Sequence, residues 1–255
     1  MALQLKRIAL AIALILIWEL SSRAFNLQFY ISQPSVVAAR VVQWIADGTL
    51  AHHTWITLVE ATVGFVTGAA LGIACGLLLG RAERLAGLLD PFLSGFYSLP
   101  KVALAPLFIL WFGIDIKMKI IFVAMVVFFP VFLNTYAGVR NVSREQISIL
   151  RLMGAKEHHL IGKVILPSAI VWVFAGLRLS IPYALIGALI GEMIATNQGL
   201  GYLIAYNSGM FDTTGTLAAL VVVVIIAVAL NGAVRLAERW LMPWQEVHET
   251  QEVVL

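Results

Sequence analysis

Charged residues are scarce in this sequence. Only 12% of its 255 residues are Asp, Glu, Lys or Arg, whereas 61% are hydrophobic. A soluble protein of this size needs more polar surface than this, and long apolar runs are typical of membrane proteins. The runs are also too long and too uniform for the alternating strands, of about ten residues, that build a membrane barrel. The sequence therefore predicts an all-α membrane protein with several spanning helices.

The usual motifs of catalytic and metal sites are missing as well. The chain contains one cysteine, Cys75, so no disulfide can form within it. No GxxxxGK[ST] phosphate loop, HExxH, GxSxG or cysteine cluster occurs. We therefore expect no catalytic residue, no metal site and no bound cofactor in this chain. Energy for any work it does must come from a partner protein or from an ion gradient.

The apolar runs predict six transmembrane helices. Their expected bounds are 7–22, 54–80, 92–113, 118–139, 167–195 and 214–240. The first run could be a signal peptide, because Lys6 and Arg7 precede its apolar core. No small-residue cleavage site follows that core, so we favour a retained anchor over a cleaved signal.

Basic residues are distributed unequally between the two sides of these spans. With the N-terminus inside, eleven Lys and Arg residues lie on the cytoplasmic side and four lie outside, namely Arg23, Arg40, Lys117 and Lys119. This bias predicts that both termini face the cytoplasm. The net charge of +3 would favour nucleic acid as a partner of a soluble protein. In a membrane protein the placement of the charges matters more, and we expect no nucleic-acid partner.

The stretch 34–53, between the first two spans, has apolar and polar residues at helical spacing. Val37, Val41 and Trp44 alternate with Arg40 and Gln43. This pattern predicts an amphipathic helix along the outer membrane interface. The pair at 52 and 53, both histidine, could suggest a metal site. No other ligand stands at suitable spacing beside them, so we interpret them as interfacial polar residues.

The second span carries a ladder of glycines at intervals of four. Its members are Gly64, Gly68, Gly72, Gly76 and Gly80. Small residues at this spacing form a groove that lets a neighbouring helix approach closely. We favour a packing seam within one subunit, and a moving surface or a subunit-pairing surface is the alternative.

Prolines and ionisable residues interrupt three of the spans. Pro100, Lys101 and Pro106 lie in the third span, Arg178 and Glu192 in the fifth, and Glu60 in the second. Prolines free backbone carbonyls, which at membrane depth need partners from protein or from a water-filled cavity. Ionisable groups are costly there and indicate either function or a clamp between helices. We predict that the residues of the third and fifth spans line a translocation pathway.

The segment 140–167 is the one long polar passage between spans. It reads RNVSREQISILRLMGAKEHHLIGKVILP. The segment resembles the cytoplasmic loop of ABC-importer permeases, whose pattern is Glu-Ala-Ala, three residues, Gly, nine residues and Ile-x-Leu-Pro. Here nine residues separate Gly154 from the run 164–167, which ends in Leu166 and Pro167. The Glu-Ala-Ala positions differ, because Ser148, Ile149 and Leu150 occupy them.

The resemblance covers most of the chain. Four stretches are similar to permeases of the nitrate, taurine and alkanesulfonate importers, namely ALAPLFILWFGID (103–115), KI…FFP…NTYAGVRNV (119–142), GLRLSIP…GEMIATNQGLGYLI (176–204) and ERWLMPW (238–244). This implies a type I ABC-importer permease fold in the bacterial inner membrane. The implied domains are an anchor and interfacial helix (1–53), a permease core (54–244) and a cytoplasmic tail (245–255).

The resemblance also implies partners and site residues. A coupling helix at about 148–158 would dock on a cytoplasmic ATPase subunit, which binds the ATP and Mg²⁺. The expected coupling residues are Arg151, Leu152, Met153, Gly154, Ala155, Lys156, Glu157, His158, Leu166 and Pro167, and charged members could pair with the ATPase. A second permease copy and an extracytoplasmic substrate-binding protein complete the expected assembly. Asn197, Gly199, Gly201 and Tyr202 would lie in a loop at the outer gate, although a simple connector would need the same glycines.

Two other functions remain open on the sequence alone. An ion-gradient-driven transporter would use Glu60, Arg178 and Glu192 as a relay, but such proteins usually contain internal repeats, and we find none. An intramembrane enzyme would need a nucleophile and a base at recognisable spacing, which the chain lacks. The substrate is also open. Lys101 and Arg178 suit an anion, and sulfonates, taurine, nitrate, aromatic carboxylates and vitamin precursors are all candidates.

Glu145 could replace the missing motif glutamate, because it lies three residues before Ser148 on the same helical face. On this hypothesis, Glu145→Ala weakens association with the ATPase subunit. Copurification and coupled ATP hydrolysis test it, and an unchanged yield of the complex with unchanged activity would refute it.

Overall fold

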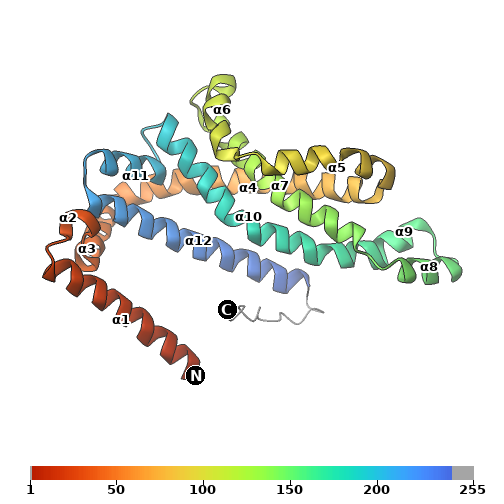
Figure 1. The fold of residues 1–255 in the computed structure, drawn as a ribbon, viewed down its shortest axis with the longest axis horizontal. Helices are drawn as coiled ribbons and strands as arrows, with labels where there is room; N and C mark the ends of the chain where they lie inside the picture. The colour runs from red at the N-terminus through yellow and green to blue at the C-terminus, as the bar shows by residue number, and fades with distance from the viewer. Residues whose placement is uncertain (1, 243–255) are drawn as a thin grey trace. The chain divides into compact units, whose positions relative to one another are not determined.

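The computed structural model describes residues 2–242, with the side chains of all but residues 2–4, 83, 84, 86, 90, 94, 97, 144 and 195. The predicted tail at 245–255 lies outside the described residues. Every regular element in 2–242 is helical (Figure 1). The α-helices are α1 (Ala2–Ala24), α2 (Gln28–Ile31), α3 (Pro34–Ala46), α4 (Thr49–Arg81), α5 (Glu83–Ser98), α6 (Ala105–Phe112), α7 (Ile116–Arg140), α8 (Arg144–Leu152), α9 (Glu157–Leu160), α10 (Leu166–Ala195), α11 (Leu200–Gly209) and α12 (Thr213–Leu241). A 3₁₀ turn (Lys101–Leu104) precedes α6, and a π-helical turn (Ile161–Ile165) joins α9 to α10.

The chain forms two compact units. The described part of the first unit comprises 2–62, 102–122 and 185–225, and that of the second comprises 63–101, 123–184 and 226–242. The four long helices α4, α7, α10 and α12 contribute residues to both units. The core of the second unit includes Val127, Val131 and Phe132 of α7, each at most 1% exposed.

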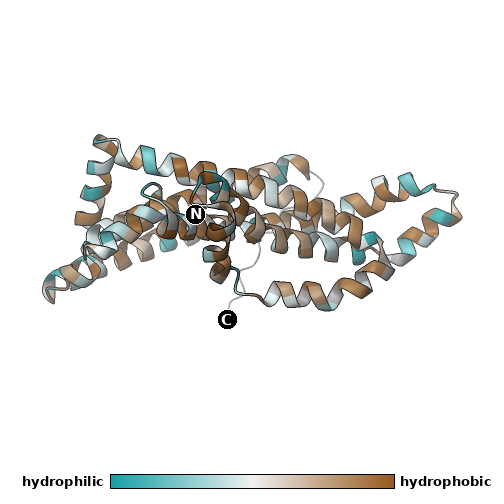
Figure 2. Cartoon of the chain, turned by 90° about the horizontal axis from the view of Figure 1, so that it is seen from above, coloured by the Kyte–Doolittle hydropathy of each residue, from teal (hydrophilic) through white to brown (hydrophobic). Residues whose placement is uncertain are grey.

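Four helical segments are long and apolar enough to cross a membrane. They are Thr49–Arg81, Ile116–Arg140, Glu157–Ile194 and Thr213–Leu241. Hydrophobic residues predominate along the long helices (Figure 2). These segments confirm four of the predicted spans. The first predicted span forms α1, but every stretch of 18 residues in this helix contains at least three of Lys6, Arg7, Glu19 and Arg23.

The third predicted span is not one continuous helix. Helix α5 ends at Ser98, Leu99 is extended, and the 3₁₀ turn and α6 follow Pro100. Proline disfavours helical backbone in the residue before it, which explains the break at Leu99. Pro106 stands in the first turn of α6, where its missing N–H removes no helical hydrogen bond. The predicted interruption is confirmed, whereas a single helix over 92–113 is wrong.

The predicted amphipathic helix is shorter than expected. Helix α3 ends at Ala46, and Gly48 turns the chain with a φ of +80°. Asp47 accepts a hydrogen bond from the Thr49 N–H at 2.9 Å, and this bond holds the pKa of the Asp47 carboxyl below its usual value. The two histidines therefore belong to the first turns of α4, not to α3.

The glycine ladder of α4 packs against α7 within the second unit. A methyl group at Gly68 would lie 2.3 Å from the Ala124 carbonyl oxygen, and one at Gly76 would lie 2.6 Å from the Thr135 Cβ. Methyl groups at Gly72 and Gly80 would also lie within 3 Å of residues of α7, at 2.9 Å and 2.7 Å. This contact confirms the predicted seam within the chain.

We expect Gly68→Ala to destabilise the protein, because the added methyl group meets backbone that cannot move alone. Overpacking of this kind costs about 1–3 kcal/mol and should lower the melting temperature of the detergent-solubilised protein. Gly87→Ala is the matched control, since a methyl group there meets nothing within 4 Å. Equal melting temperatures for the two variants would contradict the seam.

Candidate functional site

The polar segment 140–167 folds into two short helices joined by a tight turn. Ser143 caps α8 by accepting a hydrogen bond from the Gln146 N–H at 3.2 Å. At the other end Gly154 adopts a φ of +81°, its N–H bonds to the Arg151 carbonyl, and the Ala155 N–H bonds to the Leu150 carbonyl. This is a Schellman ending, which favours glycine at the left-handed position. The predicted turn at Gly154 is confirmed. A single coupling helix over 148–158 is wrong, because α8 ends at Leu152 and α9 begins at Glu157.

Two apolar side chains project from the end of α8. Leu152 is 90% exposed and Met153 is 77% exposed. Among the other expected coupling residues, Lys156 caps α9 and is exposed, His158 is exposed beside the ring of His159, and Ala155 is half-buried. The exposed tip of α8 is therefore apolar although the segment around it is charged.

Two charged residues of this segment, Arg151 and Glu157, form ion pairs inside the chain. Glu157 accepts hydrogen bonds from Arg151 at 3.0 Å and from Arg81, at the end of α4, at 3.3 Å. The sequence predicted charged partners on another protein for Arg151 and Glu157, and in this structure each has an internal one. Arg81 was not predicted as part of this site, because hydropathy marks it only as the end of a span.

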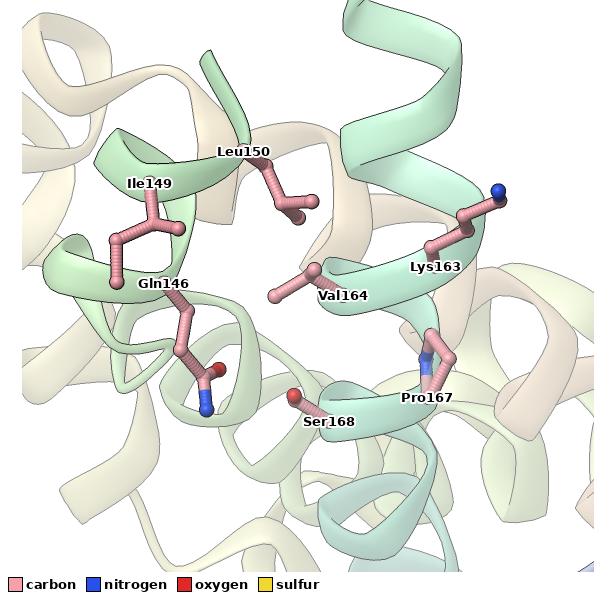
Figure 3. A pocket seen from close by; sticks show the side chains of 7 residues that line it. All are labelled: Gln146, Ile149, Leu150, Lys163, Val164, Pro167 and Ser168. Carbon is pink, nitrogen blue, oxygen red and sulfur yellow. The ribbon is translucent and has the colours of Figure 1, made fainter. Parts of the chain in front are cut away.

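Residues at the Glu-Ala-Ala positions face residues of the Ile-x-Leu-Pro positions across a groove (Figure 3). One wall is α8, with Gln146, Ile149 and Leu150, and the other is formed by Lys163, Val164, Pro167 and Ser168 of the π-helical turn and α10. The cavity measures about 430 Å³. Leu166 stands at the start of α10 and is 47% exposed. Two of the three residues that depart from Glu-Ala-Ala therefore line this groove.

A second polar site lies buried in the first unit. Thr57 and Glu60 of α4 and Glu192 of α10 are fully buried, and Lys119 of α7 is 4% exposed. Lys119 forms an ion pair with Glu60, and the Thr57 hydroxyl donates to Glu192 at 2.7 Å. The sequence analysis counted Lys119 only among the basic residues on the outer side and did not predict that it is buried. A carboxyl within a predicted span was the signal that a buried partner should exist, but hydropathy could not identify Lys119 as that partner.

Three of the four residues predicted for the outer gate, all but Asn197, contact this buried site or the neighbouring His53. Helix α11 occupies 200–209, so the expected loop over 197–212 is wrong, and Gly201 and Tyr202 are helical. Asn197 is exposed in the connection before α11. Gly199 turns the chain with a φ of +97°, and the Tyr202 ring stacks on the ring of His53 at 5.8 Å.

Backbone N–H groups at the start of α11 complete the same site. Gly199 donates to His53 Nδ1 at 2.9 Å, Leu200 to the Thr57 hydroxyl at 2.9 Å, and Gly201 to Glu192 at 2.7 Å. The sequence interpretation of His53 as a merely interfacial residue is thus incomplete, because its ring accepts a hydrogen bond from α11.

The remaining predicted pathway residues have partners of other kinds. Arg178 pairs with Glu238 of α12 at 3.2 Å, within the second unit. The Lys101 ammonium lies 5.2 Å from the centre of the Phe129 ring. Pro100 and Pro106 bound the break described above. The structure brings Glu60 and Glu192 together, whereas Arg178 has a different carboxylate as its partner. Within the described residues no group of three or more His, Cys, Asp or Glu could hold a metal ion.

We expect Lys119→Met to destabilise the protein strongly, because it leaves Glu60 buried without its cation. Loss of one partner of a buried pair costs about 3–5 kcal/mol. Thermal unfolding in detergent measures the effect. Adding Glu60→Gln to Lys119→Met should recover most of the loss, and Lys117→Met, at an exposed neighbour, should change little. Equal unfolding temperatures for the two lysine variants would contradict the pairing.

Comparisons with known proteins agree with this fold. Residues 68–245 match the family model described as binding-protein-dependent transport system inner membrane component. The chain is 35% identical to a putative aliphatic sulfonates transport permease protein SsuC of Bacillus subtilis, over 85% of this chain and 78% of that protein. It is 30% identical to the formylaminopyrimidine transport permease protein ThiX of Halalkalibacterium halodurans, over 91% and 93% of the two chains. It is 28% identical to the taurine transport system permease protein TauC of Escherichia coli, over 92% and 87%.

A solved structure shares the architecture. An inward-facing structure of the MetNI methionine ABC transporter matches with a TM-score of 0.64 and 18% identity, over 73% of this chain and 93% of that one. The fold is therefore that of a type I ABC-importer permease. The family match covers more than half of the chain, and the sulfonate and taurine permeases are among its relatives. The chain belongs to the family of binding-protein-dependent transport system inner membrane components, as an ABC-importer permease of the sulfonate and taurine group.

Proposed function

We propose that this chain moves a small organic or inorganic anion into the cytoplasm by alternating access, driven by a separate ATPase subunit. The observation that carries the proposal is the exposed apolar tip of α8, which lies beside the groove between α8 and the start of α10. Leu152 and Met153 are 90% and 77% exposed and adjacent, and contiguous exposed apolar side chains in a polar surrounding are typical of contact surfaces. The proposed occupant of this surface is the ATPase.

The contacts around α8 supply a route for motion. Glu157 links Arg151, at the end of α8, to Arg81, at the end of α4. The π-helical turn continues α9 directly into α10. A push on α8 would therefore reach two long helices through ion pairs and through continuous backbone. Type I transport by rigid-body movement of packed helices needs such connections.

The proposed assembly follows the family. It has two copies of this chain, two ATPase subunits and an extracytoplasmic substrate-binding protein. We propose six membrane spans, with α1 and the α5–α6 region added to the four long helices, and with both termini in the cytoplasm. The domain bounds proposed are 1–53, 54–244 and 245–255.

A sulfonate, taurine or a nitrate-like anion is the proposed substrate. The likeness to SsuC and TauC supports this class, while the name of ThiX shows that similar permeases serve other molecules. Lys101 and Arg178 are the cations proposed for the pathway. The ion pair of Arg178 with Glu238 means that an anion there would have to compete with a carboxylate.

The alternative is an ion-gradient-driven transporter that uses Glu60, Arg178 and Glu192. The burial of Glu60 and Glu192 in one site is the observation in its favour. Family membership and the separate partner of Arg178 favour the ATP-driven importer.

Uptake by purified protein in liposomes tests the proposal. We expect uptake of a labelled sulfonate or taurine to require ATP, the ATPase subunit and the binding protein. The double variant Leu152→Ser and Met153→Ser should lose ATPase association and uptake. Met210→Ser is the control, because Met210 is also exposed, at 64%, but belongs to the first unit. Gradient-driven uptake by this chain alone would refute the proposal.

A further inference from the structure

Helix α11 begins without local capping. The first N–H groups of a helix have no partner within it, and a Ser, Thr, Asp or Asn side chain at the N-cap usually supplies one. The N-cap of α11 is Gly199, which has no side chain. Its own N–H and those of the next two residues are nevertheless bonded to His53, Thr57 and Glu192. Three consecutive amides are thus held by side chains of two other helices.

The spacing of these acceptors fits the three amides. His53 and Thr57 are four residues apart on α4, so they lie on one face of that helix. The Thr57 hydroxyl accepts from Leu200 and donates to Glu192 at 2.7 Å, a shorter contact than its 3.2 Å to the His53 carbonyl. One hydroxyl proton serves the nearer acceptor, so the hydroxyl joins α4, α10 and α11.

The glycines of this segment allow the carboxylate to approach. A methyl group at Gly199 would lie 2.1 Å from the Glu192 Cδ, and one at Gly201 would lie 2.3 Å from the Leu189 carbonyl oxygen. The Glu192 carboxyl group therefore lies against the start of α11 and accepts from the Gly201 N–H. A side chain at Gly199 would displace this carboxyl group, and one at Gly201 would meet the Leu189 carbonyl and the Glu192 Cβ.

We propose that His53, Thr57 and Glu192 form an amide clamp, which fixes the start of α11 to α4 and α10 so that the three move as one body. These are positioning residues for the outer gate, and the gate itself rests on the proposed function. Because the clamp occupies all three amides, the start of α11 is closed to a passing anion. The start of α11 therefore moves together with α4 and α10 and does not bind substrate.

Hydrogen exchange measured by mass spectrometry, with residue-resolving fragmentation, tests the clamp on the assembled transporter in lipid nanodiscs. We expect slow exchange at the amides of 199–201, which would exchange fast in an uncapped first turn. Thr57→Val should accelerate exchange at Leu200 about tenfold or more, since a buried amide loses its acceptor. Thr57→Ser should restore protection.

Thr135→Val is the matched control. Thr135 is as fully buried as Thr57, but among the described residues its hydroxyl has no hydrogen-bond partner. If Thr57→Val does not fold, His53→Phe is the variant to test instead. It keeps an aromatic ring beside Tyr202 and removes only the acceptor of the Gly199 amide. His52→Phe, at the exposed neighbouring histidine, is its control.

A functional measurement separates positioning from simple stability. The measured quantity is the number of ATP molecules hydrolysed per substrate molecule transported. The clamp predicts that Thr57→Val raises this ratio several-fold and that Thr135→Val does not. If His53→Phe is used instead, it should raise the ratio and His52→Phe should not. Unchanged exchange at 199–201, or a uniform rise along α4, α10 and α11, would overturn the clamp. Wild-type protein that shows slow exchange at these amides but no ATP-driven uptake would overturn the proposed function and leave the clamp standing.

Discussion

Polar groups inside an apolar chain have to be satisfied by the chain itself, and this constraint organises the structure. Water is absent from the hydrocarbon region, so each N–H, C=O or charge placed there needs a protein partner. Helices satisfy most of the backbone. The remaining groups gather into a few contacts: Lys119 with Glu60, Glu192 with the start of α11, and Arg178 with Glu238. The first and the last of these contacts join helices that are distant in the sequence, and the second joins the consecutive helices α10 and α11.

The two polar sites use these contacts differently. In the second unit, ion pairs surround an apolar tip that remains exposed, which leaves Leu152 and Met153 available to another protein. In the first unit, every polar atom of the Thr57 and Glu192 side chains is occupied from within. One site is open to a partner and the other holds the chain together, although both contain ion pairs between helices.

The sequence predicted the features that depend on local pattern. Hydropathy identified the four long helices, the interval of four identified the seam of α4, and Gly154 identified the left-handed turn. Features that depend on tertiary pairing were missed. Hydropathy placed Lys119 at the edge of a span and could not say which way it faces. The glycines at 199 and 201 indicated a loop, because their close approach to Glu192 and Leu189 is visible only in three dimensions. Arg81 and Glu238 were missed for the same reason, since each finds its partner on another helix.

The buried ion pair also implies an order of events during synthesis. Glu60 lies in α4, and its cation lies in α7, so the ribosome makes the carboxylate before α5, α6 and the start of α7 exist. An ionisable residue inside an inserting helix is costly until it is paired. Glu60 therefore enters the membrane without a counter-ion. It can pair with Lys119 only after α7 has been inserted. Glu192, made later still, joins a pair that is already neutral, and α11 follows directly behind it. The order of the helices along the chain thus makes Glu60 wait for Lys119, as Arg178 of α10 waits for Glu238 of α12.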